Sequence, residues 1–127
     1  MVDVLSNAIN TIKNNETVGN DWCVVPDTRL VKAVLDVMKT SNYITGYEPF
    51  ENGSHTMLKV GLSKKINNIG TIRPRYAVRL VDYQRYEERY IPSKDFGILI
   101  ISTPKGIVTN REAKEKKIGG RLLAYVY

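Results

Sequence analysis

The chain has 127 residues, 43% of them hydrophobic and 25% charged, and its 19 Lys and Arg against 13 Asp and Glu give a net charge of +6. These values are typical of a folded soluble protein and exclude a disordered chain. There is no apolar run of the roughly 20 residues that span a bilayer and no signal-peptide pattern, so we expect a cytoplasmic protein without a membrane partner. One cysteine and one histidine cannot form a disulfide or a zinc cluster, and we expect no metal and no cofactor.

The charge is distributed unevenly along the chain. Residues 1–63 contain 5 Lys and Arg against 7 Asp and Glu, a net charge of −2, whereas residues 64–127 contain 14 against 6, a net charge of +8. This change of sign predicts two small subdomains, the second of which has a basic face that meets a polyanion. A basic surface that only maintains solubility is the alternative.

The first half is predicted to fold in the order helix, strand, helix, strand, strand. Apolar residues three and four apart indicate a helix over 3–14, and residues 22–25 are typical of a short strand. An Asn-Gly dipeptide predicts a hairpin between strands at 43–50 and 56–62. These elements make a small sheet with two helices on one side.

The second helix is expected to begin after Pro26, with Asp27 as its N-cap. Arg29 and Lys32 lie in its first turn, where the helix dipole favours acids rather than cations. Contact with a phosphate would explain two cations at this end of a helix. Two surface cations whose stems cover apolar surface explain them equally well.

Residues 64–94 hold 8 Lys and Arg against 3 Asp and Glu. Tyrosines are interleaved with these charges, at Tyr76, Tyr83, Tyr86 and Tyr90. Such a mixture can bind backbone phosphates and stack on exposed bases, although we expect at least half of the tyrosines to be core residues. Arg73 and Arg75 flank a proline and are expected to contact phosphate, and residues 83–86 are expected near a connecting loop.

A buried strand at 98–101 is followed by a short polar loop. The loop residues are Ser102, Thr103, Pro104, Lys105 and Gly106. Pro104 cannot donate a hydrogen bond to a sheet and must end the strand, and Gly106 lets the chain turn. The loop could hold a phosphate, a ribose hydroxyl or a base edge, but these residues alone favour a plain turn.

After the loop, Thr109 and Glu112 fit a capping box at the start of a short helix. Gly119 and Gly120 are expected to stop that helix, and residues 122–127 form a final strand. The second half is therefore predicted to be mainly β with a short helix, and the fold class of the whole chain to be α+β.

The run ISTPKGIVTNREAKEKKIGGRLLAYVY closely resembles the C-terminal signature of the small-subunit ribosomal protein eight family, in its archaeal style, and the resemblance covers the whole chain. It implies a ribonucleoprotein component that acts in translation and is not an enzyme. Such a protein binds an internal stem of the central domain of the small-subunit rRNA and helps to assemble the subunit platform. Its other partners are neighbouring small-subunit ribosomal proteins, and it has no small-molecule substrate.

The resemblance also implies which residues bind RNA. The reading loop is Ser102, Thr103, Lys105 and Gly106, and the residues that shape it are Pro104, Thr109, Gly119 and Gly120. The first helix adds Ser6, Asn7, Lys13 and Asn14. Charge and composition complete the set with Arg29, Lys32, Arg73, Arg75 and Tyr86. Many members of the family have a hydroxyl residue where Pro104 stands, so any contact made by that hydroxyl is lost or replaced here.

Two other classes of function compete with RNA binding. A protein-interaction module could use its basic half to bind an acidic protein, and would then bind RNA weakly with no preference for a structured stem. A small hydrolase could use Ser102 and Lys105, but the sequence offers no positioned base or third catalytic group.

Overall fold

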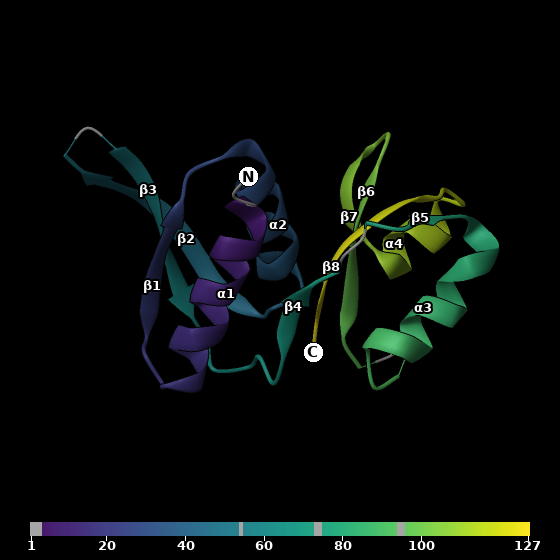
Figure 1. Cartoon of the computed structure of the whole chain (residues 1–127), viewed down its shortest axis with the longest axis horizontal. Helices are drawn as coiled ribbons and strands as arrows, with labels where there is room; N and C mark the ends of the chain where they lie inside the picture. Colours follow the sequence, from purple (N-terminus) through teal and green to yellow (C-terminus); the bar gives the residue numbers. More distant parts are fainter. Residues whose placement is uncertain (1–3, 54, 73–74, 94–95) are drawn as a thin grey trace. The chain divides into compact units, whose positions relative to one another are not determined.

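The computed structural model of the chain describes residues 4–53, 55–72, 75–93 and 96–127. It divides into two compact units, Met1–Ile66 and Asn67–Tyr127, each with two helices and an antiparallel sheet (Figure 1). The α+β class is thus confirmed. The assignment of RNA binding to residues 64–127 as a subdomain stays a prediction.

The N-terminal unit is a three-stranded sheet covered on one face by two helices (Figure 1). Its elements are α1 (Val4–Thr17), β1 (Trp22–Pro26), α2 (Arg29–Thr40), β2 (Ile44–Asn52) and β3 (His55–Leu62), with the strand order β1-β3-β2. The helical stripe predicted for α1 is buried, at Leu5, Ala8, Ile9 and Ile12. The predicted order helix, strand, helix, strand, strand is confirmed.

Both helices of this unit differ from the prediction at one end. α1 continues to Thr17, three residues beyond the predicted end, and the chain leaves the helix before Gly19, whose φ is +81°. The N-cap of α2 is Thr28 rather than Asp27, because the Thr28 hydroxyl accepts a hydrogen bond from the Val31 N–H at 3.1 Å. The Asp27 carboxylate instead lies 3.2 Å from Nζ of Lys32.

The C-terminal unit is a five-stranded antiparallel sheet in the order β4-β8-β6-β7, with β5 also paired to β8. Its elements are β4 (Ile69–Thr71), β5 (Ala77–Val78), the 3₁₀ turn η1 (Leu80–Asp82), α3 (Tyr83–Tyr90), β6 (Ile98–Thr103), β7 (Gly106–Thr109), α4 (Asn110–Glu115) and β8 (Gly120–Val126). Its core includes Tyr83, Tyr86, Leu99, Ile101, Val108, Ala113 and Leu122.

One prediction for this unit was incomplete and one was wrong. Residues 83–86, expected near a connecting loop, begin α3 directly after a turn closed by a hydrogen bond from the Arg79 N–H to the Asp82 carboxylate at 3.0 Å. This backbone donor is the main reason that the pKa of Asp82 lies below its ordinary value. The last turn of α4 is ended by Lys117, with φ +56°, and not by the two glycines.

A buried polar network joins α3, α4 and β6. The Glu87 side chain of α3 is 3% exposed and accepts hydrogen bonds from Asn110 Nδ2 and from Lys114 Nζ, the latter at 2.5 and 2.6 Å. Asn110, 2% exposed, accepts a hydrogen bond from the Leu99 N–H at 3.1 Å. The network therefore compensates a buried carboxylate and satisfies a backbone donor of β6.

Replacement of Lys114 by Met is expected to lower the free energy of unfolding by about 2–3 kcal/mol, because the buried Glu87 carboxylate loses its cation. Lys116→Met is the matched control, since Lys116 pairs with Glu112 at 3.1 Å with both side chains over 40% exposed. That exposed pair contributes about 0.5 kcal/mol or less. Urea unfolding followed by circular dichroism compares the two variants, and equal losses would contradict the role given to Glu87.

Candidate nucleic-acid interface

The predicted polar loop is the tight turn of the β6–β7 hairpin. Thr103 pairs with Gly106, so that only Pro104 and Lys105 connect the strands. The strand ends before Pro104 as predicted, and Gly106 has φ +114°, a value that favours glycine. Pro104, Lys105 and Gly106 are exposed. The hairpin therefore presents a short turn with one lysine on it.

Thr103 holds this turn together. Its hydroxyl donates a hydrogen bond to the Gly106 carbonyl at 2.7 Å and accepts one from the Lys105 N–H at 3.1 Å. The hydroxyl proton is used inside the turn, which leaves an oxygen lone pair for an outside donor. The geometry thus makes Thr103 a residue that shapes the loop, a role that the sequence interpretation did not give it.

Ser102 is placed differently from its neighbour. It is half-buried and lies opposite Ile107 of β7 and Arg121 of β8. Its hydroxyl makes no hydrogen bond to any other described residue, in contrast to that of Thr103. Ser102 therefore keeps both its donor and its acceptors for a ligand.

Of the residues predicted to shape the loop, Gly120 lies directly beside it, whereas Thr109 lies at the far end of β7, opposite Ile100. A Cβ on Gly120 would fall 2.3 Å from the Ser102 carbonyl oxygen, so only glycine lets β8 approach β6 this closely. Thr109 at the end of β7 is the N-cap of α4, as predicted, and accepts a hydrogen bond from the Glu112 N–H at 3.1 Å. Gly119 lies further away, where a Cβ would meet the Val78 carbonyl oxygen at 2.4 Å.

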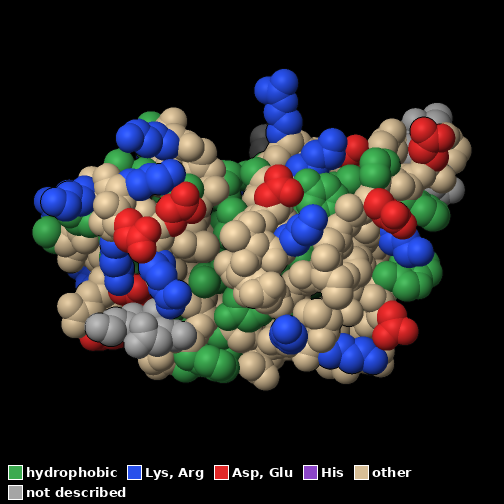
Figure 2. All heavy atoms as spheres, turned by 180° about the vertical axis from the view of Figure 1, so that it is seen from behind, with side chains coloured by type: hydrophobic (Ala, Val, Ile, Leu, Met, Phe, Trp, Pro, Cys, Tyr) green, Lys and Arg blue, Asp and Glu red, His purple; other side chains and the backbone are tan. Residues whose placement is uncertain are grey.

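Basic side chains lie near the end of β6 that carries Ser102. Arg121 is exposed opposite Ser102, and its Nη1 donates to the Arg75 carbonyl at 3.2 Å, which brings two exposed arginines together. On the face drawn in Figure 2, lysine and arginine side chains gather over the C-terminal unit, at the left of the view. Arg121 was not predicted from the sequence. Only its pairing with Ser102, which the structure shows, marks it as a residue of this interface. Arg73 and Pro74 lie outside the described residues.

The tyrosines of residues 64–94 divide into core and surface. Tyr83 and Tyr86 are 1% and 8% exposed and belong to the core, whereas Tyr76 and Tyr90 are half-buried against it. Tyr86, which was expected to bind RNA, stacks on Tyr76 with ring centroids 5.7 Å apart. Little of its ring is accessible to a ligand.

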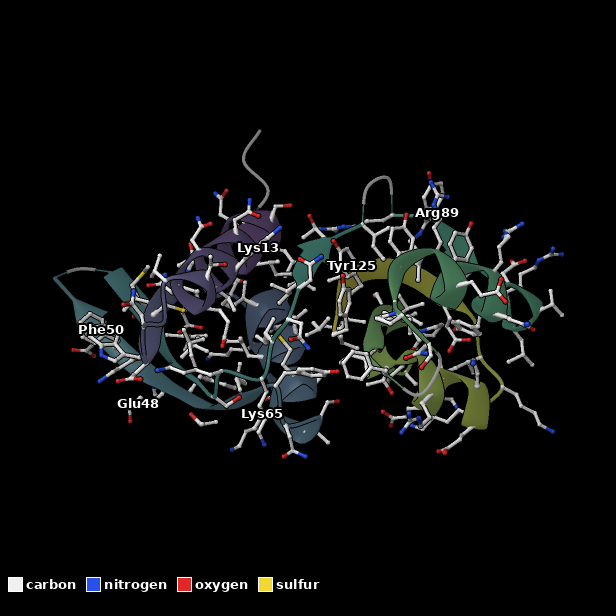
Figure 3. All side chains as sticks on the ribbon, turned by 90° about the horizontal axis from the view of Figure 1, so that it is seen from below. Lys13, Glu48, Phe50, Lys65, Arg89 and Tyr125 are labelled. Carbon is white, nitrogen blue, oxygen red and sulfur yellow. The ribbon has the colours of Figure 1, made fainter. Side chains whose placement is uncertain are left out.

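The predicted contacts of the N-terminal unit have different environments. Asn7, Lys13 and Asn14 are exposed on α1, whereas Ser6 is 7% exposed. Figure 3 shows Lys13 on this helix. Arg29 is exposed at the start of α2. Lys32 is already engaged by the Asp27 carboxylate, so a phosphate would have to compete with that ion pair.

Neither a metal cluster nor a membrane helix is found in the part of the chain that the structure describes. Among those residues, no three His, Cys, Asp or Glu side chains lie together as metal ligands would. None of the helices described is long and apolar enough to cross a membrane. The chemistry of the hairpin is that of hydroxyls, backbone groups and cations.

Comparison with known proteins adds independent information. The family model of ribosomal protein S8 matches residues 3–127. The chain is 48% identical to the small ribosomal subunit protein uS8 of Archaeoglobus fulgidus over 127 residues, which cover 99% of this chain and 98% of that protein. Ribosomal structural proteins are not a class of enzymes. Since the match extends over nearly the full length of both proteins, the chain belongs to the ribosomal protein S8 family.

Proposed function

We propose that this protein, a structural constituent of the small ribosomal subunit by its family, binds directly to an internal stem of the central domain of the small-subunit rRNA. It thereby helps to assemble the subunit platform, in the cytoplasm and beside other small-subunit ribosomal proteins. The observation that carries the proposal is the β6–β7 hairpin, which combines a rigid turn, an exposed Lys105 and a Ser102 hydroxyl that no other described residue engages.

The shape of the hairpin suits the minor groove of an RNA stem. A-form RNA has a wide, shallow minor groove that displays ribose 2′-hydroxyls and base edges. The Ser102 hydroxyl can both donate to and accept from such groups, and the Thr103 oxygen can accept one further bond. Because the Thr103 hydrogen bonds already fix the turn, little conformational entropy is lost when RNA binds.

In this proposal, cations supply affinity that does not depend on the RNA sequence. Lys105, Arg75 and Arg121 are exposed in the C-terminal unit and can each neutralise a backbone phosphate. Asn7, Lys13 and Arg29 offer a few further contacts from the N-terminal half, whose net charge of −2 suits it less well to a polyanion. The runner-up function, binding of an acidic protein, would use the same cations but would leave Ser102 without a role.

Ser102→Ala is expected to weaken binding of the central-domain stem by about 1–3 kcal/mol, because a positioned polar contact is lost. Binding of a generic RNA duplex of equal length should change little. Fluorescence anisotropy titrations with both RNAs measure the difference. Thr103→Ser serves as a control that retains the hydroxyl of the turn, and it should bind the stem almost as the wild type does. Equal losses on stem and duplex in Ser102→Ala would contradict a reading role for the hairpin.

Lys105→Ala and Arg121→Ala are each expected to reduce the slope of log K against log salt by roughly one, as loss of one phosphate contact does. The same titrations, repeated at several salt concentrations, give this slope. Lys39→Ala removes an exposed cation from α2 and is expected to leave the slope unchanged. A slope unaffected by the first two substitutions would mean that neither side chain contacts the RNA backbone.

A further inference from the structure

A second basic and aromatic surface lies on α3, apart from the turn of the β6–β7 hairpin (Figure 1). At its centre, the Arg89 guanidinium carbon lies 5.9 Å from the ring centroid of Tyr76 and 5.4 Å from that of Tyr90. Arg89 is exposed and points away from the ribbon of α3 (Figure 3), and both rings are half-buried. We call Arg89, Tyr76 and Tyr90 the α3 patch.

Each ring of the α3 patch is supported from behind by another ring. Tyr76 stacks on the buried Tyr86, and Tyr90 stacks on Tyr125 of β8, with centroids 5.7 Å apart in both pairs. Tyr125 in turn stacks on Tyr127 at 6.3 Å. The rings beside Arg89 are therefore held by the core and the sheet, so that the patch is ordered before any ligand arrives.

The guanidinium of Arg89 is positioned but not neutralised. Its neighbour Arg85 lies 3.7 Å from the Asp82 carboxylate, which Arg79 shares at 3.5 Å. Arg89 has no such ion pair with any carboxylate of the described ranges. Contact with ring faces leaves the in-plane N–H donors of a guanidinium available, and that planar fork matches the oxygens of a phosphate.

We propose that the α3 patch binds an unpaired nucleotide of an RNA, with a phosphate on the Arg89 guanidinium and the base against the accessible face of Tyr76 or Tyr90. The inference rests on the proposed function in taking RNA as the ligand, but it concerns a different contact and a different RNA conformation from the hairpin. Unpaired bases stack on aromatic side chains and on arginine planes, whereas bases within a stem are already stacked on each other.

An acidic peptide fits these residues less well than an unpaired nucleotide. A carboxylate would engage the Arg89 fork but would leave the two ring faces unused. A nucleotide uses both, because every base has a π-face and every linkage a phosphate. The net charge of +8 on residues 64–127 favours the polyanion as well.

The test is a titration of the full-length chain with a fluorescein-labelled ten-nucleotide oligouridine, which has no stable base pairs. Arg89→Ala is expected to weaken its binding roughly 10- to 100-fold, the range for loss of a charge-assisted hydrogen-bonded contact to the phosphate. Arg89→Lys should lose most of the same affinity, since it keeps the charge but not the planar fork. Arg111→Ala, which removes an exposed arginine of α4 that no ring contacts among the described residues, should change binding less than about threefold.

Three results would overturn the inference: no oligouridine binding by the wild type, equal effects of Arg89→Ala and Arg111→Ala, or full retention of affinity in Arg89→Lys. Poly-glutamate that competes better than oligouridine for the wild type, and does so through Arg89, would also overturn it and assign the patch to an acidic protein. The stem titration of Ser102→Ala tests the role of the hairpin independently of Arg89. Equal losses on stem and duplex in Ser102→Ala, together with oligouridine binding that depends on Arg89, would reject only the proposed function. A loss on the stem alone in Ser102→Ala, together with oligouridine binding that does not depend on Arg89, would reject only the α3 patch.

Discussion

The carboxylate of Glu87 is the constraint on which the C-terminal unit depends. An ionised group that is 3% exposed must be compensated, and its partners come from α4, through Asn110 and Lys114. Asn110 is also the acceptor for the Leu99 N–H of β6. The charge thus fixes α3 and α4 to the same central strand, and that strand continues directly into the hairpin.

The rigidity of the hairpin follows from this arrangement. β6 is paired on both sides, with β7 and with β8. Different side-chain hydrogen bonds hold its two ends. Asn110 satisfies a donor near its start, and Thr103 closes the turn at its end. Pro104, the first residue of the turn, has a ring with a fixed φ, which restricts the turn further. In the proposed complex, this preorganised turn leaves the Ser102 hydroxyl to contact the RNA.

Features set by local chemistry could be predicted from the sequence, and features set by pairing could not. The turn at Pro104 and Gly106 and the N-cap at Thr109 depend on residues within four positions of one another. The register that places Arg121 opposite Ser102 depends on an irregularity of the β6–β8 pairing at Ile100/Ile101, which leaves no local sequence signal. The choice of Thr28 over Asp27 as N-cap was equally undetermined, since both are good capping residues.

The helix α3 was not predicted from the sequence for a further reason. Its eight residues are too few to form a stable helix by themselves, and the segment is stabilised by burial of Tyr83 and Tyr86 one turn apart. The same burial explains why a tyrosine count overstates the accessible aromatic surface. The sequence shows a basic and aromatic segment, but only the structure separates the buried ring of Tyr86 from the half-buried ring of Tyr76 that stacks on it.

These contacts divide selectivity from affinity in the proposed complex. Ser102 and the backbone of the turn are neutral, so their contribution to binding depends on geometry and only weakly on salt. Lys105, Arg75, Arg121 and Arg89 are charged and contribute to any RNA, in proportion to the counterions released. Because the first group lies on a rigid strand end and the second on other, exposed side chains of the same unit, a substitution can remove one property without the other. A protein that must select one stem among many similar polyanions requires that separation, since stronger charge alone would strengthen binding to every competitor equally.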